Sequence, residues 1–454
     1  MSRHIQRRDV LKGTGALGIG MVAGCVGTDP DEADDTPADD TADDTADDTA
    51  DDGPDEDLTP DSVMVVGFPQ SGIQIFRDFY GEFADGAPDL EIIVPDGLID
   101  SDLPGDVDNP MNNVYGTAPA ADGPGADFFA EAFEDAYGDS PGPFNAHAYD
   151  AMAVSVLAAT AAGENDGTAI RDRMATVANP NGEEFTSEEL PEAVEAVAAG
   201  DPVNYQGASS PVDFDPNGDM QAVAYDIYDF RDGEIVQTDR IEFEAPDVEG
   251  EIITEDPVGV DDFEAMVGVL MPETGDLGPL GGPIRDAALL AAEHINDAGL
   301  NVSVDTSTED TQTDPQAGIS GGNALVDSGY EIVVGPAASN VNFQVISEVY
   351  LPNNVVGISP SSTAPGITHL EDDGYIFRTA PSDALQGPVM ADVVMDQLGH
   401  DNTATLYLND EYGDALEDTY VNAFEDGGGE VRNRVAFEPE QPSYTSQWAE
   451  VLDV

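Results

Sequence analysis

Positive charge is what this sequence lacks most. It carries 13 Lys plus Arg against 94 Asp plus Glu, a formal net charge of −81, and its single lysine is Lys12. Because it offers no basic face for phosphates, nucleic acid and anionic membrane surfaces are not expected partners. With 40% hydrophobic residues, a disordered acidic protein is a poor alternative. Repulsion among so many acids is screened at high salt, where the Debye length is roughly 3 Å at 1 M, so the composition is typical of an extreme halophile.

Cysteine is almost absent as well, so no disulfide within the chain is expected. The one cysteine, Cys25, ends the opening stretch MSRHIQRRDVLKGTGALGIGMVAGC. Arg7 and Arg8 fit a twin-arginine export signal, and the apolar run that follows is too short to span a bilayer. The last residues before Cys25 resemble a lipobox, whereas a lone cysteine is otherwise more often a buried apolar residue. We therefore expect residues 1–25 to be a signal and lipid at Cys25 to anchor the exported protein to the outer face of the membrane.

Residues 26–60 have few large apolar side chains, and the repeat within them has none larger than alanine. A TADD repeat starts at Thr41, Thr45 and Thr49, and acidic residues dominate the rest of the segment. Such a segment has nothing with which to build a core, so we expect an acidic, disordered linker between the anchor and the folded part.

Clustered catalytic or metal-binding residues are also missing. The five histidines are scattered, and no pattern of Cys and His with metal-ligand spacing is present. Ser320, in Gly-Ile-Ser-Gly-Gly, matches the G-x-S-x-G nucleophile motif, but it precedes an expected strand instead of following one. We therefore expect no enzyme, no catalytic residue, no metal and no cofactor, with an exported serine hydrolase using Ser320 as an alternative.

From Val63 onward, apolar runs alternate with stretches of helical period. Strands are expected within 63–68, 90–97, 266–272, 331–339, 355–362 and 403–410, and helices over 126–138, 148–163 and 284–299. Residues 225–236 predict a hairpin around Asp232-Gly233. Alternating strands and helices favour an α/β fold with parallel, doubly wound sheets, whose ligands bind beyond the carboxyl ends of the strands.

Several motifs then point to a known family. GPLGGPIRDAALLAAEHINDAG, GPAASN, ISPSSTAPGIT and YIFRTAPSDALQGPVMAD follow one another after residue 277, and YGTAPAADGPG and FDPNGDMQAVAYDIYDFRDG come earlier in the chain. They resemble the type I periplasmic binding proteins of ABC importers, above all the leucine/isoleucine/valine-binding branch. The resemblance implies two Rossmann-like lobes with a cleft between them. It also implies an extracellular substrate-binding lipoprotein that binds an amino acid, or a related amide, and delivers it to permease subunits. A ligand-sensing receptor component is the alternative within the same family.

The order of the halves departs from that family. Residues 61–240 resemble its C-terminal half, residues 241–262 read as a linker, and residues 263–454 resemble its N-terminal half. We expect a circular permutation in which the two halves form one two-lobed body, since surface loops tolerate such cuts. A fusion of truncated tandem copies and a faulty gene model are the alternatives. One lobe should hold roughly 263–380 with 118–208, and the other 384–454 with 61–117 and 213–240.

The resemblance also implies ligand contacts from the lobe of 263–380. Ser339 matches the serine that binds the ligand carboxylate through its hydroxyl and backbone N–H. Thr363 matches the threonine that helps to hold carboxylate and ammonium, and Ser361 the residue that offers its carbonyl to the ammonium. Any one of these residues alone could be an ordinary turn hydroxyl, but they follow neighbouring strands.

From the other lobe, Tyr412 matches an aromatic residue that closes over the ligand. Phe68 stands where the family often has tyrosine, so that hydroxyl contact is not expected here. Asp96 stands where the leucine-binding branch has a glutamate that pairs with the ammonium, and its side chain is shorter. An aspartate in so acidic a chain is usually a solvated surface group, but Asp96 directly follows a continuous apolar strand.

Overall fold

The computed structural model describes residues 59–244, 248 and 250–454. Asp57–Val454 form one compact unit, which contains two large sheets and a small one. The expected signal 1–25 with Cys25, and the expected linker 26–60 up to residue 58, lie outside the described residues.

One large sheet is wholly parallel and comes from a single stretch of chain. Its five strands lie in the order β12-β11-β10-β8-β9. Continuous apolar runs such as VGVLM form its buried strands, as expected for a parallel sheet covered on both faces. The strands are β8 (Phe263–Met271), β9 (Val302–Asp310), β10 (Ile332–Val334), β11 (Val356–Ser359) and β12 (Ile376–Arg378).

Helices from both halves of the chain cover this sheet. Helix α4 (Asn145–Ala162) is buried along its whole length, and its many alanines let it pack closely against α8 (Gly278–Asp297). The small parallel sheet of β4 (Glu183–Thr186) and β5 (Val203–Gln206) lies on the same side. The other elements of this lobe are α3 (Ala126–Tyr137), α5 (Gly167–Arg171), α6 (Met174–Ala178), η3 (Ser187–Glu189), α7 (Leu190–Ala198), α9 (Pro315–Asp327), α10 (Ser339–Val345), η4 (Ile346–Tyr350), α11 (Leu351–Asn353) and η5 (Pro365–His369).

The other large sheet is assembled from both ends of the described chain. Its order is β14-β13-β1-β2-β3-β6-β7, parallel from β14 to β3, with β6 and β7 added antiparallel. The strands are β1 (Ser62–Val66), β2 (Glu91–Val94), β3 (Val114–Pro119), β6 (Ala222–Arg231), β7 (Glu234–Glu244), β13 (Asn402–Leu408) and β14 (Glu430–Phe437). Its helices are α1 (Pro69–Asp78), η1 (Phe79–Phe83), η2 (Asp96–Leu98), α2 (Leu103–Val107), α12 (Asp383–Asp392), η6 (Val393–Leu398), α13 (Gly413–Asp426) and α14 (Thr445–Val451).

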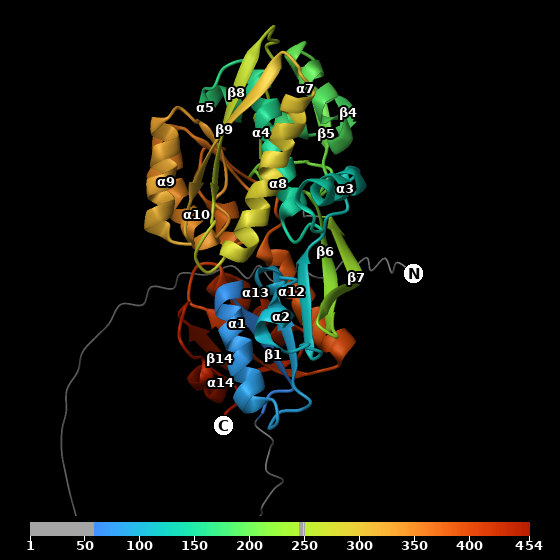
Figure 1. The fold of residues 1–454 in the computed structure, drawn as a ribbon, viewed down its shortest axis with the longest axis vertical. Coiled ribbons are helices and arrows are strands. Elements are labelled where there is room, and N and C mark those ends of the chain that lie inside the picture. The colour runs from blue at the N-terminus through green and yellow to red at the C-terminus, as the bar shows by residue number, and fades with distance from the viewer. Residues whose placement is uncertain (1–58, 245–247, 249) are drawn as a thin grey trace, which may run out of the picture. The chain divides into compact units, whose positions relative to one another are not determined.

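The two ends meet at β1 and β13, which pair in parallel with Ser62 opposite Thr403. Figure 1 shows the same mixture, with blue segments from the start of the described chain among red segments from its end. The last helix, α14, extends the contact: the indole N–H of Trp448 donates to the carbonyl of Ile75 at 2.9 Å, and its ring packs against Phe79. Neither part of the chain completes this sheet by itself.

Most expected elements are present, with two corrections. The segment expected as a linker from residue 241 begins inside β7, because the hairpin strands continue beyond Asp232-Gly233, whose positive φ angles of 54° and 85° suit a tight turn. The helix expected from residue 284 starts at Gly278, because Pro279 lies in its first turn, where no N–H is needed. Residues 250–262 carry no regular structure but are held to the five-stranded lobe by Val258 N–H to Ala161 O at 2.9 Å.

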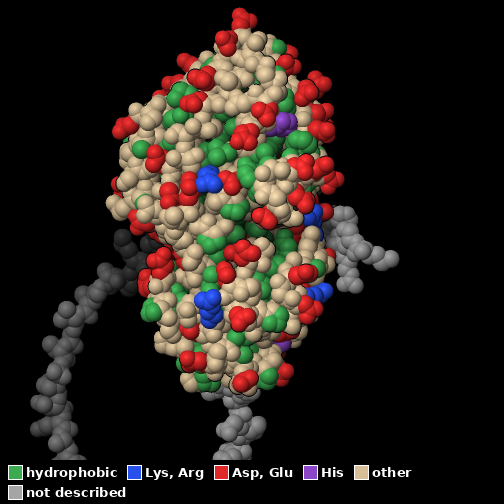
Figure 2. All heavy atoms as spheres, viewed as in Figure 1, with side chains coloured by type: hydrophobic (Ala, Val, Ile, Leu, Met, Phe, Trp, Pro, Cys, Tyr) green, Lys and Arg blue, Asp and Glu red, His purple; other side chains and the backbone are tan. Residues whose placement is uncertain are grey.

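Acidic side chains cover the face drawn in Figure 2, where Lys and Arg are few. Within the part of the chain that the structure describes, every helix is too short or too polar to cross a bilayer.

Candidate functional site

A cavity lies between the two large sheets, and its volume is about 300 Å³ when the solvent at its open side is counted. Its walls come from both lobes, beyond the carboxyl ends of the strands, where doubly wound sheets bind ligands. Five of the six residues predicted from the sequence line it. The lining residues are Phe68, Asp96, Gly97, Phe144, Leu277, Leu280, Ile284, Ala337, Ala338, Ser339, Ser361 and Tyr412.

Asp96 is the buried acid of this cavity. It lies two residues after β2, in a single turn of 3-10 helix, and is 3% exposed. The hydroxyl of Tyr412 donates to its Oδ1 at 3.2 Å, while its Oδ2 has no hydrogen-bond partner. Burial raises the pKa of Asp96 to about 6, although the hydrogen bond from Tyr412 acts in the opposite direction. The free oxygen is a buried acceptor that a cationic donor would satisfy.

Phe68 and Tyr412 form an aromatic face beside Asp96. Their rings stack with centroids 5.3 Å apart and planes 6° apart. Gly97 fits under them because it has no side chain: a Cβ there would lie 2.5 Å from the carbonyl oxygen of Gly67. Burial also raises the pKa of Tyr412 well above its usual value, so this phenol stays a hydrogen-bond donor.

The opposing wall carries hydroxyl groups. Ser339 begins α10 directly after the loop that follows β10, and its Oγ accepts the Ala364 N–H at 3.3 Å. Ser361 follows β11, and its hydroxyl donates to the carbonyl of Ala337 at 3.2 Å. The structure thus brings both serines to one side of the cavity, facing the wall of Asp96 and Tyr412.

Thr363 is placed differently from the other predicted residues. It is buried behind the serine loop and is not among the residues that line the cavity. Its hydroxyl donates to Asp383 Oδ2 at 2.9 Å, and the Asp383 N–H donates to its carbonyl at 2.8 Å. Thr363 therefore joins the loop of one lobe to the start of α12 in the other, and its role as a direct ligand contact stays a prediction.

Asp383 and Gln386, which sequence reasoning missed, add acceptors next to Asp96. Asp383 Oδ1 and Gln386 Oε1 are buried without a hydrogen-bond partner. Burial, followed by the charge of Asp96, raises the pKa of Asp383 well above its usual value. The protonated form of Asp383 is therefore favoured while Asp96 carries a charge. The unpaired oxygens beside Asp96 are acceptors that a cationic donor could satisfy.

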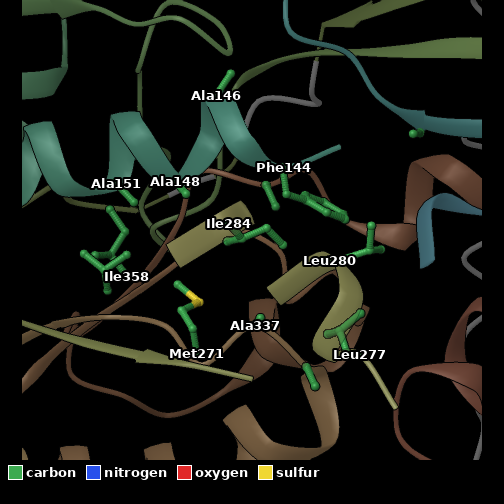
Figure 3. Close-up of a cluster of buried hydrophobic side chains, with 14 of the residues drawn as sticks. Phe144, Ala146, Ala148, Ala151, Met271, Leu277, Leu280, Ile284, Ala337 and Ile358 are labelled. Carbon is green, nitrogen blue, oxygen red and sulfur yellow. The ribbon is translucent and has the colours of Figure 1, made fainter. Parts of the chain in front are cut away.

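The rest of the lining, also missed from the sequence, is apolar. Figure 3 shows the side chains of Phe144, Leu277, Leu280 and Ile284 directed toward one region, with Ala337 close by. Leu277 and Leu280 follow β8 as the chain enters α8, so the rule that places site residues after strands would have found them. Phe144 gave no such signal: it precedes α4 with a φ of 66°, a left-handed conformation that is rare for a bulky side chain and common at functional sites.

Ser320 does not form a nucleophile elbow. It lies in the middle of α9, exposed, with its hydroxyl donating to the carbonyl of Gln316 at 2.8 Å. A nucleophile elbow requires a sharp turn between a strand and a helix. Over residues 59–244, 248 and 250–454, no group of three or more His, Cys, Asp or Glu is placed to hold a metal ion.

The cavity wall has three chemically different regions. An acidic, aromatic wall faces hydroxyl groups, and an apolar chamber extends beside them. This arrangement can hold a small molecule with a cationic group, an anionic or polar group and an apolar substituent.

The chain is similar to known proteins over part of its length. Residues 264–453 match the family described as Periplasmic binding protein. The Leu/Ile/Val-binding protein homolog 3 of Brucella melitensis is 32% identical over 166 residues, which are 36% of this chain and 44% of that protein. The leucine-, isoleucine-, valine-, threonine- and alanine-binding protein of Pseudomonas aeruginosa is 32% identical over 164 residues, 35% of this chain and 43% of that protein.

The chain thus spans less than half the length of these relatives in either alignment. Among solved structures, a leucine-binding protein from Thermotoga maritima aligns with 40% of this chain and 52% of its own, at 21% identity and a TM-score of 0.38.

Proposed function

We propose that this protein is a type I periplasmic binding protein of the branched-chain amino acid branch, which binds an amino acid between its two lobes for an ABC importer; the match of residues 264–453 to the periplasmic binding protein family supports this. That family consists of solute-binding proteins and not of enzymes. The observation that carries the proposal is the single cavity that joins Asp96 and Tyr412 of one lobe to Ser339 and Ser361 of the other.

In this proposal the ligand lies as a zwitterion across the cavity. Its ammonium pairs with Asp96, whose Oδ2 has no partner in the protein. Its carboxylate faces Ser339 and Ser361, with hydroxyl groups and backbone N–H groups as donors. Since a buried carboxylate without a cation is costly, Asp96 favours ligands that carry an amine.

The side chain of the ligand would enter the chamber of Phe144, Leu277, Leu280 and Ile284. These residues offer apolar contact and no charge, which favours a branched aliphatic side chain over a polar one. The names of both relatives include leucine, isoleucine and valine, and that of the Pseudomonas protein adds threonine and alanine. Within the class, we propose leucine, isoleucine or valine, with related amides as weaker ligands.

Export and anchoring form a second part of the proposal. The twin arginines Arg7 and Arg8 and the lipobox at Cys25 support a lipoprotein held outside the cell, where a binding protein meets its ligand and its permease. Mass spectrometry of the mature N-terminus would detect lipid on Cys25, and a Cys25→Ser chain should appear in the medium. Retention of the Cys25→Ser chain in the membrane would contradict the anchor.

The order of the chain is a third part. We infer that residues 61–240 are the family's C-terminal half and 263–454 its N-terminal half. The pairing of β1 with β13 supports one two-lobed body built from both halves, and a fusion of complementary truncated copies would build the same sheet.

Isothermal titration at multimolar salt tests the ligand class most simply. Leucine, isoleucine and valine should bind with one site per chain, and a ligand at 100 times its Kd should stabilise the fold by roughly 2.7 kcal/mol in thermal unfolding. Lysine and glutamate are the controls: they are amino acids with charged side chains, and they should not bind. If neither aliphatic nor aromatic amino acids release heat on titration, the proposed ligand class is wrong.

A further inference from the structure

A buried contact joins the two lobes beside the cavity without using any residue of its lining. Asp276 lies between β8 and α8 in the five-stranded lobe, and Ser71 lies in the first turn of α1 in the other lobe. The Ser71 N–H donates to Asp276 Oδ1 at 2.6 Å, and the Ser71 hydroxyl donates to Asp276 Oδ2 at 2.8 Å. Both residues are buried, at 1% and 4% exposure.

This contact supplies hydrogen-bond acceptors for the N-terminus of α1. The first N–H groups of a helix have no partner within it, and Phe68, at the capping position, supplies no side-chain acceptor. Pro69 has no N–H to satisfy. The N–H of Gln70 donates to the carbonyl of Asp276 at 3.3 Å, and that of Ser71 donates to its carboxylate. The N-terminus of a helix in one lobe is therefore capped by a residue of the other lobe.

A third segment of the chain also forms a hydrogen bond with the Ser71 hydroxyl. The Glu440 N–H, in the chain between β14 and α14, donates to Ser71 Oγ at 3.0 Å. Ser71 thus accepts from its own lobe and donates to the opposite one. Burial raises the pKa of Asp276 to about 6 against the Ser71 hydrogen bonds, and Glu440 raises it further, so at neutral pH the group is an ionised acceptor.

The capping contact is linked directly to both walls of the cavity. Phe68 precedes α1, Leu277 follows Asp276, and both line the cavity. Separating the lobes would remove Asp276 from α1 and leave the N–H groups of Gln70 and Ser71 to water. Any opening of the cleft at this point would therefore also remove the cap of α1.

We propose that Asp276 is a positioning residue that holds the lobes closed by capping α1 across the cleft, and so sets how long a ligand is retained. The ligand part of this inference rests on the proposed function, whereas the contact between lobes does not. Asp276 acts through Ser71 and touches no ligand.

Distance measurements without ligand test the contact itself. Spin labels at Ser320→Cys in α9 and Ser446→Cys in α14, both exposed positions in different lobes, report lobe separation in a full-length Cys25→Ser chain. Asp276→Ala should increase the fraction of molecules at the longer distance. Asp314→Ala is the matched control, because Asp314 caps α9 within one lobe through the Ala317 N–H at 2.8 Å.

Ligand dissociation tests the consequence. Removing a helix cap of ordinary strength should raise the leucine dissociation rate of Asp276→Ala about fivefold, with the association rate unchanged. Ser71→Ala should have a smaller effect, and the double variant should match Asp276→Ala alone, because both act through one contact. Asp314→Ala should lower the unfolding temperature and leave the dissociation rate unchanged.

Three results would overturn the inference: an unchanged distance distribution in Asp276→Ala, slower leucine release from that variant, or additive effects of the two substitutions. If the unsubstituted chain binds no amino acid, the proposed function fails, and the ligand-free distances still decide whether Asp276 holds the lobes together.

Discussion

The two walls of the cavity are built in different ways. The wall of Ser339 and Ser361 comes from a sheet whose five strands follow one another in a single stretch of chain. The wall of Asp96 and Tyr412 comes from a sheet that needs both ends, and the hydrogen bond between these two side chains joins residues 316 positions apart. The acidic wall is therefore the part of the site that depends on the ends of the fold meeting.

This difference between the two walls indicates which substitutions should damage the site most. The serine wall rests on strands from a single stretch of chain and on α4, which packs against them. The acidic wall forms only when β13 lies against β1 and α14 against α1. Substitutions at the junction of the chain ends should thus damage ammonium recognition, even far from the cavity.

Trp448→Ala should have the largest effect. The indole is fully buried, donates to Ile75 and packs on Phe79, so its loss should cost about 3–5 kcal/mol of unfolding free energy. Denaturant unfolding at constant high salt measures this loss of unfolding free energy. Trp448→Phe, which keeps most of the packing, should cost clearly less; equal losses would mean that the junction contributes little through packing.

Asp96→Ala should weaken leucine binding by more than about tenfold, since an ionic hydrogen bond to the ammonium is lost. Titration calorimetry measures the Kd. Asp89→Ala, an exposed aspartate near the same strand, should bind as the unsubstituted chain does. An unchanged Kd for Asp96→Ala would remove this carboxylate from the site.

Acid should weaken binding through the same wall. Burial holds the pKa of Asp96 at about 6, so the carboxylate that pairs with the ammonium is ionised above pH 6 and protonated below it. The affinity should be constant from pH 7 to 8 and fall by up to about tenfold per pH unit below 6. An affinity that rises on acidification would have the wrong sign for this assignment.

Leu280→Ala should produce a smaller effect on the other wall. Truncation removes apolar contact with a branched side chain, so leucine should bind about fivefold more weakly while alanine, too short to reach, should be little affected. Calorimetry with leucine and alanine checks this prediction. Equal losses of affinity for the two ligands would mean that Leu280 does not contact the ligand's side chain.

Ser320→Ala should change nothing in binding. Its hydroxyl bonds within α9 to Gln316, away from both walls. Ester hydrolysis by the unsubstituted chain that disappears in Ser320→Ala would instead support the hydrolase alternative.

The sequence predicted the elements and the polar residues better than the apolar ones. The resemblance to the family indicated Ser339, Ser361 and Asp96, and their place after apolar strands fitted it, because side chains that follow parallel strands gather at one edge. Phe144 gave no comparable signal, since only its left-handed backbone conformation and long-range packing set it apart. Thr363 looked like its neighbours in sequence, yet Asp383, twenty positions later, engages its hydroxyl.

The contact of Asp276 with Ser71 was also beyond sequence reasoning. The two residues lie 205 positions apart, and neither stands in a recognisable capping pattern of its own helix. Pairings of this kind depend on how two lobes meet, which local patterns do not encode.

The most direct measurement of the account is assembly from two separate chains, residues 1–249 and 250–454, produced together. If the halves complete each other's sheets, light scattering on the purified material should give one 1:1 complex that binds leucine as the intact chain does. Two independently folded monomers that do not associate would contradict the shared sheet and, with it, the cavity between Asp96 and Ser339.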